Sequence, residues 1–307
     1  MKIIRRKFQT ETDYWRIRDF LREVFLLNGR HEFSWQVARL DYWRFFGNEF
    51  LEHYRLEDVI HLWETAEGRI VACVTPESRG NAYFQVHPDF HTLELEEEML
   101  AAAEESLPEP THDGKHTLTV WAHQHDHLRQ RLLEQCGYVK GEWHEFQRQR
   151  SLDLPLPEAH APGMTVRSLG DESELPARSW VSWRAFHPDE PDDKYVGWEW
   201  YHNIQRCPLY RRDLDLVAVA ENGDFAGFTT VWYDDVTRTG YFEPVGVSPE
   251  YQRRGVGKVV MCEGMRRLKR LGGTLATVGG YSEAANALYS SVMSKDYDLA
   301  ERWQKVW

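Results

Sequence analysis

The stretch Val247-Ser248-Pro249-Glu250-Tyr251-Gln252-Arg253-Arg254-Gly255-Val256-Gly257-Lys258 carries the strongest structural signal in this sequence. It follows an apolar segment, residues 240–247, that is typical of a strand, and small or apolar residues recur after it at the spacing of one helix face. The first N–H groups of a helix have no partner inside the helix and lie at the positive end of its dipole. Because glycines allow a phosphate to approach such N–H groups closely, this strand, turn and helix predict a site for a diphosphate.

Other phosphate-binding motifs do not fit the same stretch. A P-loop requires glycine at the position of Gln252 and Ser or Thr at that of Val259. A dinucleotide-binding fingerprint requires a third glycine where Val260 stands, together with a parallel sheet. A glycine-rich turn with no function is the remaining alternative, and the two arginines and the lysine beside the glycines favour the phosphate site.

The elements around this turn predict an α/β (α+β) domain in the second half of the chain. Two predicted strands, 216–220 and 225–233, flank Asn222-Gly223, which is a strong hairpin signal, and a third strand at 240–247 completes an antiparallel meander. The helix after the turn ends at Gly272-Gly273. We then expect a strand, a helix capped by Ser282 and a final strand, at residues 275–278, 283–292 and 299–307.

The first half of the chain repeats this order of elements. Strands are expected at 58–65, 69–75, 81–86 and 118–121, and helices at 93–107 and 126–136. Val86-His87-Pro88-Asp89-Phe90 matches the segment that begins at Val247 at an offset of 161 residues, which indicates duplicated domains. A linker rich in proline and glycine, residues 154–163, is expected to separate a first domain, 1–153, from a second, 164–307.

The first copy lacks the features of the phosphate turn. At the same offset, carboxylates stand where the second copy has glycines and a lysine: Glu94 for Gly255, Glu96 for Gly257 and Glu97 for Lys258. Carboxylates suit the start of a helix, but they repel a diphosphate. We therefore expect the first domain to be non-catalytic and to serve as a structural partner.

The motif Val247-x-Pro249-x-x-Gln252-x-x-Gly255-x-Gly257 resembles the signature of the GNAT N-acetyltransferase superfamily, and the order of elements is similar over Thr165–Trp307. Ala285-Asn286-Ala287-Leu288-Tyr289 resembles the second motif of that family, although Met293-Ser294 stand where the family usually has Gly-Phe. The whole chain resembles the tandem GNAT proteins, mycothiol synthase among them. The resemblance implies two GNAT-like domains, each a mixed, mostly antiparallel sheet flanked by helices.

The resemblance also implies acetyl-CoA as the cosubstrate and acetyl transfer to a primary amine by direct attack in a ternary complex. In the family the strand before the turn is splayed from its neighbour, so that its exposed backbone binds the pantetheine arm. The implied cofactor-binding residues are Val245, Val247, Gln252, Arg253, Arg254, Gly255, Val256, Gly257, Lys258 and Asn286.

Two residues are expected to carry the proton transfers. Tyr289 lies three residues after Asn286 on one helix face, which the resemblance places at the cofactor sulfur, so Tyr289 is the expected general acid. Glu243 alternates with Tyr241 and Val245 along a strand and is the expected base, with a solvated or paired carboxylate as the alternative. The acceptor site is expected in segments 179–191 and 195–201, where aromatic and acidic residues gather; an ordinary amphipathic helix and loop is the alternative.

Composition and residue spacing argue against several classes of function. The net charge of −12 argues against nucleic-acid binding, and no stretch approaches the roughly 20 apolar residues of a membrane span. The four cysteines are scattered, with no C-x-x-C pair, so we expect reduced thiols and a cytoplasmic protein. His123, His125 and His127 have the spacing of metal ligands, yet no further ligands are obvious in the sequence, and no metal site is expected.

Two alternatives stand beside an enzyme that acts on a small-molecule or peptide amine. A CoA-binding sensor or scaffold without turnover would keep the phosphate turn, but the intact Tyr289 and Asn286 argue against it. An aminoacyl-tRNA-dependent transferase would also pair two GNAT-like folds, and the net charge of −12 argues against that class.

Overall fold

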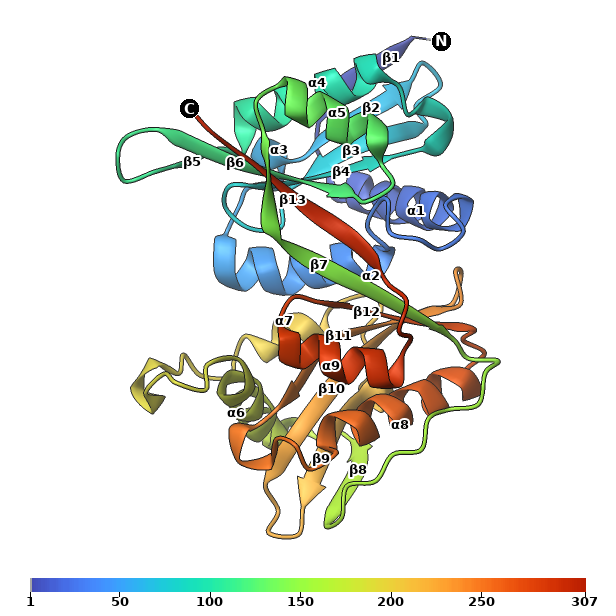
Figure 1. The fold of residues 1–307 in the computed structure, drawn as a ribbon, viewed down its shortest axis with the longest axis vertical. Coiled ribbons are helices and arrows are strands. Elements are labelled where there is room, and N and C mark those ends of the chain that lie inside the picture. Colours follow the sequence, from blue (N-terminus) through green and yellow to red (C-terminus); the bar gives the residue numbers. More distant parts are fainter. Residues whose placement is uncertain (1) are drawn as a thin grey trace. The chain divides into compact units, whose positions relative to one another are not determined.

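The computed structural model describes residues 2–307, and the chain forms two compact units (Figure 1). Unit 1 is Met1–Phe146 with Asp298–Trp307, and unit 2 is Gln147–Tyr297. This division differs from the expected domains, because the last strand lies in unit 1 and the boundary falls before the proline-rich linker. No helix among residues 2–307 is long and apolar enough to cross a membrane.

Unit 2 is built on a mixed sheet. In sheet order its strands are β8 (Met164–Ser168), β9 (Asp215–Ala220), β10 (Phe225–Asp234), β11 (Thr239–Val247) and β12 (Leu275–Gly280), followed by the end of β7 (Val139–Ser151). Strands β8 to β11 are antiparallel neighbours, whereas β11 and β12 run parallel. The helices are α6 (Leu175–Phe186), α7 (Tyr201–Gln205), α8 (Val256–Arg270) and α9 (Glu283–Val292).

Unit 1 repeats the mixed sheet. Its strands are β1 (Ile3–Lys7), β2 (His61–Thr65), β3 (Ile70–Thr75), β4 (Asn81–Val86), β6 (His116–His123) and β13 (Asp298–Val306), with β5 (Glu109–Pro110) beside β6. Strand β13 pairs with β6 from Ala300↔His123 to Val306↔Thr117, which ties the end of the chain to unit 1. The helices are α1 (Glu11–Leu27), α2 (Val37–Tyr42), a π-helix (Trp43–Glu52), α3 (Leu56–Val59), α4 (Leu93–Ser106) and α5 (His127–Gln135).

The mixed, mostly antiparallel strand pairing in each unit, with its flanking helices, confirms the predicted fold class. One predicted strand, 58–65, begins later, at His61, because α3 occupies its first residues.

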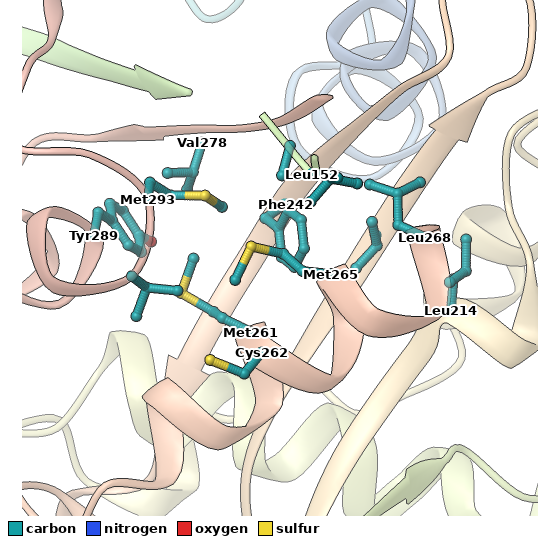
Figure 2. Packing of buried hydrophobic residues seen from close by; sticks show 13 residues of the cluster. Leu152, Leu214, Phe242, Met261, Cys262, Met265, Leu268, Val278, Tyr289 and Met293 are labelled. Atoms are coloured by element: carbon teal, nitrogen blue, oxygen red, sulfur yellow. The ribbon is translucent and has the colours of Figure 1, made fainter. Parts of the chain in front are cut away.

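Helices α6 and α8 cover opposite faces of the unit 2 sheet. A Cβ atom on Gly227 would lie 2.7 Å from Val256 of α8, whereas the next residue, Phe228, lies beside Gly246 and Ala185 of α6. Successive residues of a strand point to opposite faces, so the two helices are separated by the sheet. The core on the α8 face joins Phe242 of β11 to residues of α8 and α9, among them Met261, Met265, Tyr289 and Met293 (Figure 2).

Strands β11 and β12 separate partway along their length. Their parallel pairing runs from Thr239↔Leu275 to Tyr241↔Thr277, and beyond it the described part of β11 pairs with β10 alone. The register between β10 and β11 also shifts between Thr229 and Val231, because β11 has a β-bulge at residues 243–244, opposite Thr230. As a result Phe242 and Val245 both pack towards the core on the α8 face. The expected alternation of Tyr241, Glu243 and Val245 on one face is therefore wrong.

Candidate active site

The turn before α8 has a backbone shape suited to an anion. Gly255 precedes the first helical residue with φ +82°, and Arg253 has φ +60°, so two left-handed residues flank Arg254. Alternation of this kind turns successive N–H groups towards one point. Gly255 also has to be glycine for packing reasons, because a Cβ atom there would overlap the carbonyl oxygen of His160 in the linker.

The N–H groups of this turn are available to a ligand. Within residues 2–307, the backbone N–H groups of residues 253–258 donate to no backbone carbonyl; the first helical bond runs from Val259 N to Gly255 O at 3.1 Å. The side chains of Arg253 and Arg254 are exposed and that of Lys258 is half-buried. Gln252 is exposed as well, and its Nε2 donates to Val247 O at 3.3 Å, which ties the turn to the end of β11. These donors and cations match the acceptor oxygens of a diphosphate.

Helices α8 and α9 meet closely beside this turn. Gly257 is buried, and a Cβ atom there would lie 2.8 Å from Leu288 Cδ2 of α9 and 3.4 Å from Val247 Cγ2. Val256 is also buried, so it takes part through its backbone alone. Val245 and Val247 lie in the part of β11 that has separated from β12. The expected strand residues and the expected turn residues therefore lie at one end of the unit 2 sheet.

Tyr289 and Glu243 lie close enough to influence one another. Tyr289 belongs to the core shown in Figure 2 and is 6% exposed. Its ring packs against Gly280 at the end of β12, where a Cβ atom would lie 2.8 Å from Tyr289 Cε2. Burial raises the pKa of Tyr289 above its ordinary value, and the negative charge of Glu243 raises the pKa further. Tyr289 is thus a protonated phenol at neutral pH. Glu243 is half-buried, and its carbonyl oxygen accepts a hydrogen bond from Trp232 Nε1.

Asn286 is engaged by the protein itself. Its Nδ2 donates to Gly280 O at 3.2 Å and to Ser282 O at 3.0 Å, and its Oδ1 accepts from Arg148 Nη1 at 2.8 Å. The side-chain amide therefore holds the start of α9 against β12 and β7. Sequence reasoning did not find Arg148, which precedes the linker and belongs to neither motif.

The expected acceptor segments form an aromatic cluster on α6 and the loop after it. Trp183 stacks on Trp180 and on His187, with ring centroids 5.5 Å and 5.4 Å apart, and Tyr195 packs edge-on against Trp180 at 5.1 Å. A second, buried network was missed. Asp215 accepts hydrogen bonds from Tyr201 Oη at 2.7 Å, Tyr210 Oη at 3.0 Å and Arg178 Nε at 3.2 Å, and so anchors α6 and α7 to β9. In the sequence, the only sign of this network was a charged residue, Arg178, on the face of α6 that packs on the sheet.

In unit 1 the turn before α4 is filled by side chains of the protein. Glu96, which the 161-residue offset pairs with Gly257 and which is the fourth residue of α4, is fully buried and accepts from Arg129 Nη2 at 2.8 Å and Nε at 3.0 Å. His91 Nε2 lies 3.0 Å from the same carboxylate. Despite the cost of burial, Arg129 and His91 lower the pKa of Glu96 to about 2, so it is a carboxylate at neutral pH. An internal anion thus stands at the helix start where unit 2 leaves its N–H groups unpaired.

In unit 1 the place where β4 and β6 separate is also occupied by groups of the protein. Strands β4 and β6 pair only at Asn81↔Thr119 and Ala82↔Val120 and then separate, as β11 and β12 do. Val86, which corresponds to Val247, donates its backbone N–H to Ser34 Oγ at 3.0 Å. Trp35 N donates to Gln85 Oε1 at 2.6 Å. The segment around Ser34 therefore satisfies backbone and side-chain groups that line the cleft.

The three alternating histidines are not brought together as a ligand set. The ring centroids of His123 and His125 lie 5.5 Å apart and those of His125 and His127 lie 6.5 Å apart. Within residues 2–307, the one group of three potential ligands is His91, Glu96 and Asp126. The guanidinium of Arg129 already pairs with both carboxylates of that group, since its Nε lies 3.0 Å from Glu96 Oε2 and 3.5 Å from Asp126 Oδ2.

Comparisons with known proteins agree with this arrangement. Residues 175–293 match the model of the acetyltransferase (GNAT) family. The mycothiol acetyltransferase of Saccharopolyspora erythraea is 32% identical over 190 residues, and the match spans 58% of this chain and 58% of that relative's length.

Two solved structures share the fold of the whole chain. A GCN5-related N-acetyltransferase from Sphaerobacter thermophilus has a TM-score of 0.66 at 20% identity, over 99% of this chain and 95% of that one. A tandem GNAT protein from the clavulanic acid biosynthesis pathway has a TM-score of 0.63 at 12% identity, over 99% of this chain and 98% of that one.

The internal anion of unit 1 makes a testable contribution to stability. Glu96→Gln leaves Arg129 without its buried partner and should lower the free energy of unfolding at pH 7 by about 3 kcal/mol. The native pKa of Glu96 lies below its unfolded value of about 4.5, so its stabilisation is present above that pH and is lost as pH falls towards 2. The free energies of unfolding of wild type and variant, measured with urea, should therefore converge as the pH falls from about 4.5 towards 2. The exposed Glu97→Gln is the control and should change stability by less than about 0.5 kcal/mol. A difference between wild type and Glu96→Gln that is independent of pH would contradict the assignment.

Proposed function

We propose that this chain, whose residues 175–293 match the model of the acetyltransferase (GNAT) family, transfers an acetyl group from acetyl-CoA to a primary amine. The observation that carries the proposal is the row of unpaired N–H groups at residues 253–258, beside the separated end of β11. Unit 2 is the proposed catalytic unit. Unit 1, with both equivalent positions filled by its own side chains, is the proposed structural partner.

The proposed cofactor contacts follow the geometry of the turn. The N–H groups of residues 253–258 bind the diphosphate, with Arg253, Arg254 and Lys258 supplying positive charge. Gln252 fixes the turn to β11, and the backbone at Val245 and Val247 offers hydrogen bonds to the pantetheine arm. When bound, acetyl-CoA supplies an activated acetyl group as a thioester.

The two proton transfers are assigned to residues of unit 2. Tyr289, a neutral phenol at neutral pH, donates a proton to the departing thiolate, and Glu243 accepts the proton that the amine releases. Cys262 is buried among core residues and burial raises the pKa of its thiol, which disfavours it as a covalent relay. Attack by the amine is therefore direct, in a ternary complex.

The acceptor is proposed to be a small molecule or peptide with a primary amine. A named relative, a mycothiol acetyltransferase, supports an amine acceptor in general terms. The rings of Trp180 and Tyr195, which pack on the buried Trp183, offer a surface for a cation or an apolar body, and the loop after α6 carries the exposed carboxylates Asp189 and Glu190.

The phosphate turn is tested by a charge reversal with a control on the same helix. Lys258→Glu places a carboxylate in the first turn of α8, where it suits the helix dipole but opposes a diphosphate. A unit charge about 4 Å from a phosphate costs about 4 kcal/mol at an effective dielectric of 20, so CoA affinity should fall at least a hundredfold. Lys269→Glu, exposed at the other end of α8, changes the net charge equally and should alter affinity less than about twofold. Calorimetric titration that gives equal affinities for the two variants would place the diphosphate elsewhere.

The acid is tested by removing one hydroxyl. Tyr289→Phe keeps the buried ring against Gly280 and should lower kcat by about a hundredfold, with CoA affinity nearly unchanged. Release of free thiol in the presence of a panel of amines measures the rate. Unchanged turnover would remove Tyr289 from the mechanism. CoA binding by the wild type without turnover on any amine would instead favour a CoA sensor.

The base is tested through the pH dependence of the rate. If Glu243 accepts the amine proton, Glu243→Gln should depress kcat/KM most at low pH, where the amine is protonated, and least where the free amine predominates. The measurement is a pH profile of wild type and variant with one acceptor. A loss of equal size at every pH would assign Glu243 a structural role only.

A further inference from the structure

The last residues of β7 carry two arginines, two positions apart, that reach the two ends of α9. Arg148 is 6% exposed, and its Nη1 donates to Asn286 Oδ1 in the first turns of α9 at 2.8 Å. Its guanidinium carbon also lies 4.8 Å from the centroid of the Tyr297 ring. This cation is held between a strand and a helix, because its guanidinium is buried and contacts both an amide and an aromatic face.

Asn286 also contacts the end of β12. Its Nδ2 donates to the carbonyl oxygens of Gly280 and Ser282, and its Oδ1 accepts from Arg148. The side-chain amide of Asn286 therefore makes three hydrogen bonds within the protein. Gly280 is also the residue against which the Tyr289 ring packs. Asn286 and Tyr289 lie three residues apart on one face of α9. Asn286 and Tyr289 thus both contact Gly280 at the end of β12.

The far end of α9 is held by the second arginine. Arg150 Nη1 donates to Met293 O at 3.0 Å, and its Nη2 donates to Pro155 O of the linker at 2.5 Å. Met293 is the residue that ends α9 and is 2% exposed (Figure 2). A helix C-terminus carries partial negative charge, so a guanidinium stabilises it. Arg148 and Arg150 thus hold the start and the end of the helix that carries the proposed acid.

We propose that Arg148 is a positioning residue that acts through Asn286 to aim the Tyr289 hydroxyl. The inference rests on the proposed function, because it takes Tyr289 to be the general acid whose position depends on the contact between Arg148 and Asn286. It gives Asn286 a role in the position of α9 in place of the expected contact with the cofactor. Lysine cannot replace Arg148 in this role, because a single ammonium does not reproduce the fork of the guanidinium that reaches the amide and covers the Tyr297 ring.

A double-mutant cycle separates positioning from a general loss of structure. Arg148→Gln and Asn286→Ala should each lower kcat by about tenfold, with KM for acetyl-CoA changed less than about twofold. In the Tyr289→Phe background, Arg148→Gln should have little further effect, because the hydroxyl that it positions is gone. The exposed Arg266→Gln is the control and should leave kcat unchanged in both backgrounds. Effects that add fully in the cycle, or a KM that rises with kcat unchanged, would overturn the proposal.

Hydrogen exchange of the protein without ligand gives a readout that does not depend on activity. Arg148→Gln and Asn286→Ala should speed exchange of the backbone amides of residues 286–293 by about tenfold, with α8 unaffected. Unchanged exchange in α9 would overturn the inference whether or not the chain acetylates an amine. Faster exchange in α9 with no acetyl transfer by the wild type would mean that the proposed function fails while the contact stands.

Discussion

The separation of β11 from β12 after Tyr241 is the constraint on which the active site depends. A strand in the middle of a sheet uses its N–H and C=O groups on both sides, so it has none to offer a ligand. Here the far part of β11 keeps one partner, β10, and leads directly into a turn whose N–H groups are also unpaired. Strand and helix thus present unpaired backbone groups at the same end of the sheet, and the glycines of the turn allow a ligand to approach them.

The two units differ in what satisfies their otherwise unpaired backbone groups. Unpaired backbone groups are costly unless water, a ligand or the protein satisfies them. In unit 1 the protein supplies its own partners: Ser34 Oγ accepts from the N–H of Val86, and Thr92 Oγ1 accepts from the N–H of Leu95 in the first turn of α4. In unit 2 the corresponding groups have no such partner among residues 2–307. The same order of elements thus occurs once with open backbone groups and once with internal partners.

Much of this could be predicted from the sequence, because the signals were local. Gly255 and Gly257 mark a turn that demands glycine, Asn222-Gly223 marks a hairpin, and the offset between Val86 and Val247 marks the repeat. The fold class and the family resemblance are confirmed. The orientation of Glu243 could not be predicted from alternation, because Glu243 lies in a β-bulge that shifts the register.

The contacts that sequence reasoning missed join residues far apart in the chain. Nothing near Arg148 indicates that it meets Asn286, and nothing near residue 298 indicates that the last strand pairs within unit 1. Arg178 and Asp215 are likewise brought together only by the packing of α6 on the sheet. Such pairs depend on tertiary packing, which a single sequence does not reveal.

Hydrogen–deuterium exchange of the backbone amides, with and without CoA, tests the central claim most directly. The account predicts that CoA slows exchange at residues 253–258 and along the end of β11, because these N–H groups are the proposed ligands. It predicts no change at residues 93–97, where Glu96 already occupies the start of α4. Protection at 93–97, or CoA binding without protection at 253–258, would contradict the account.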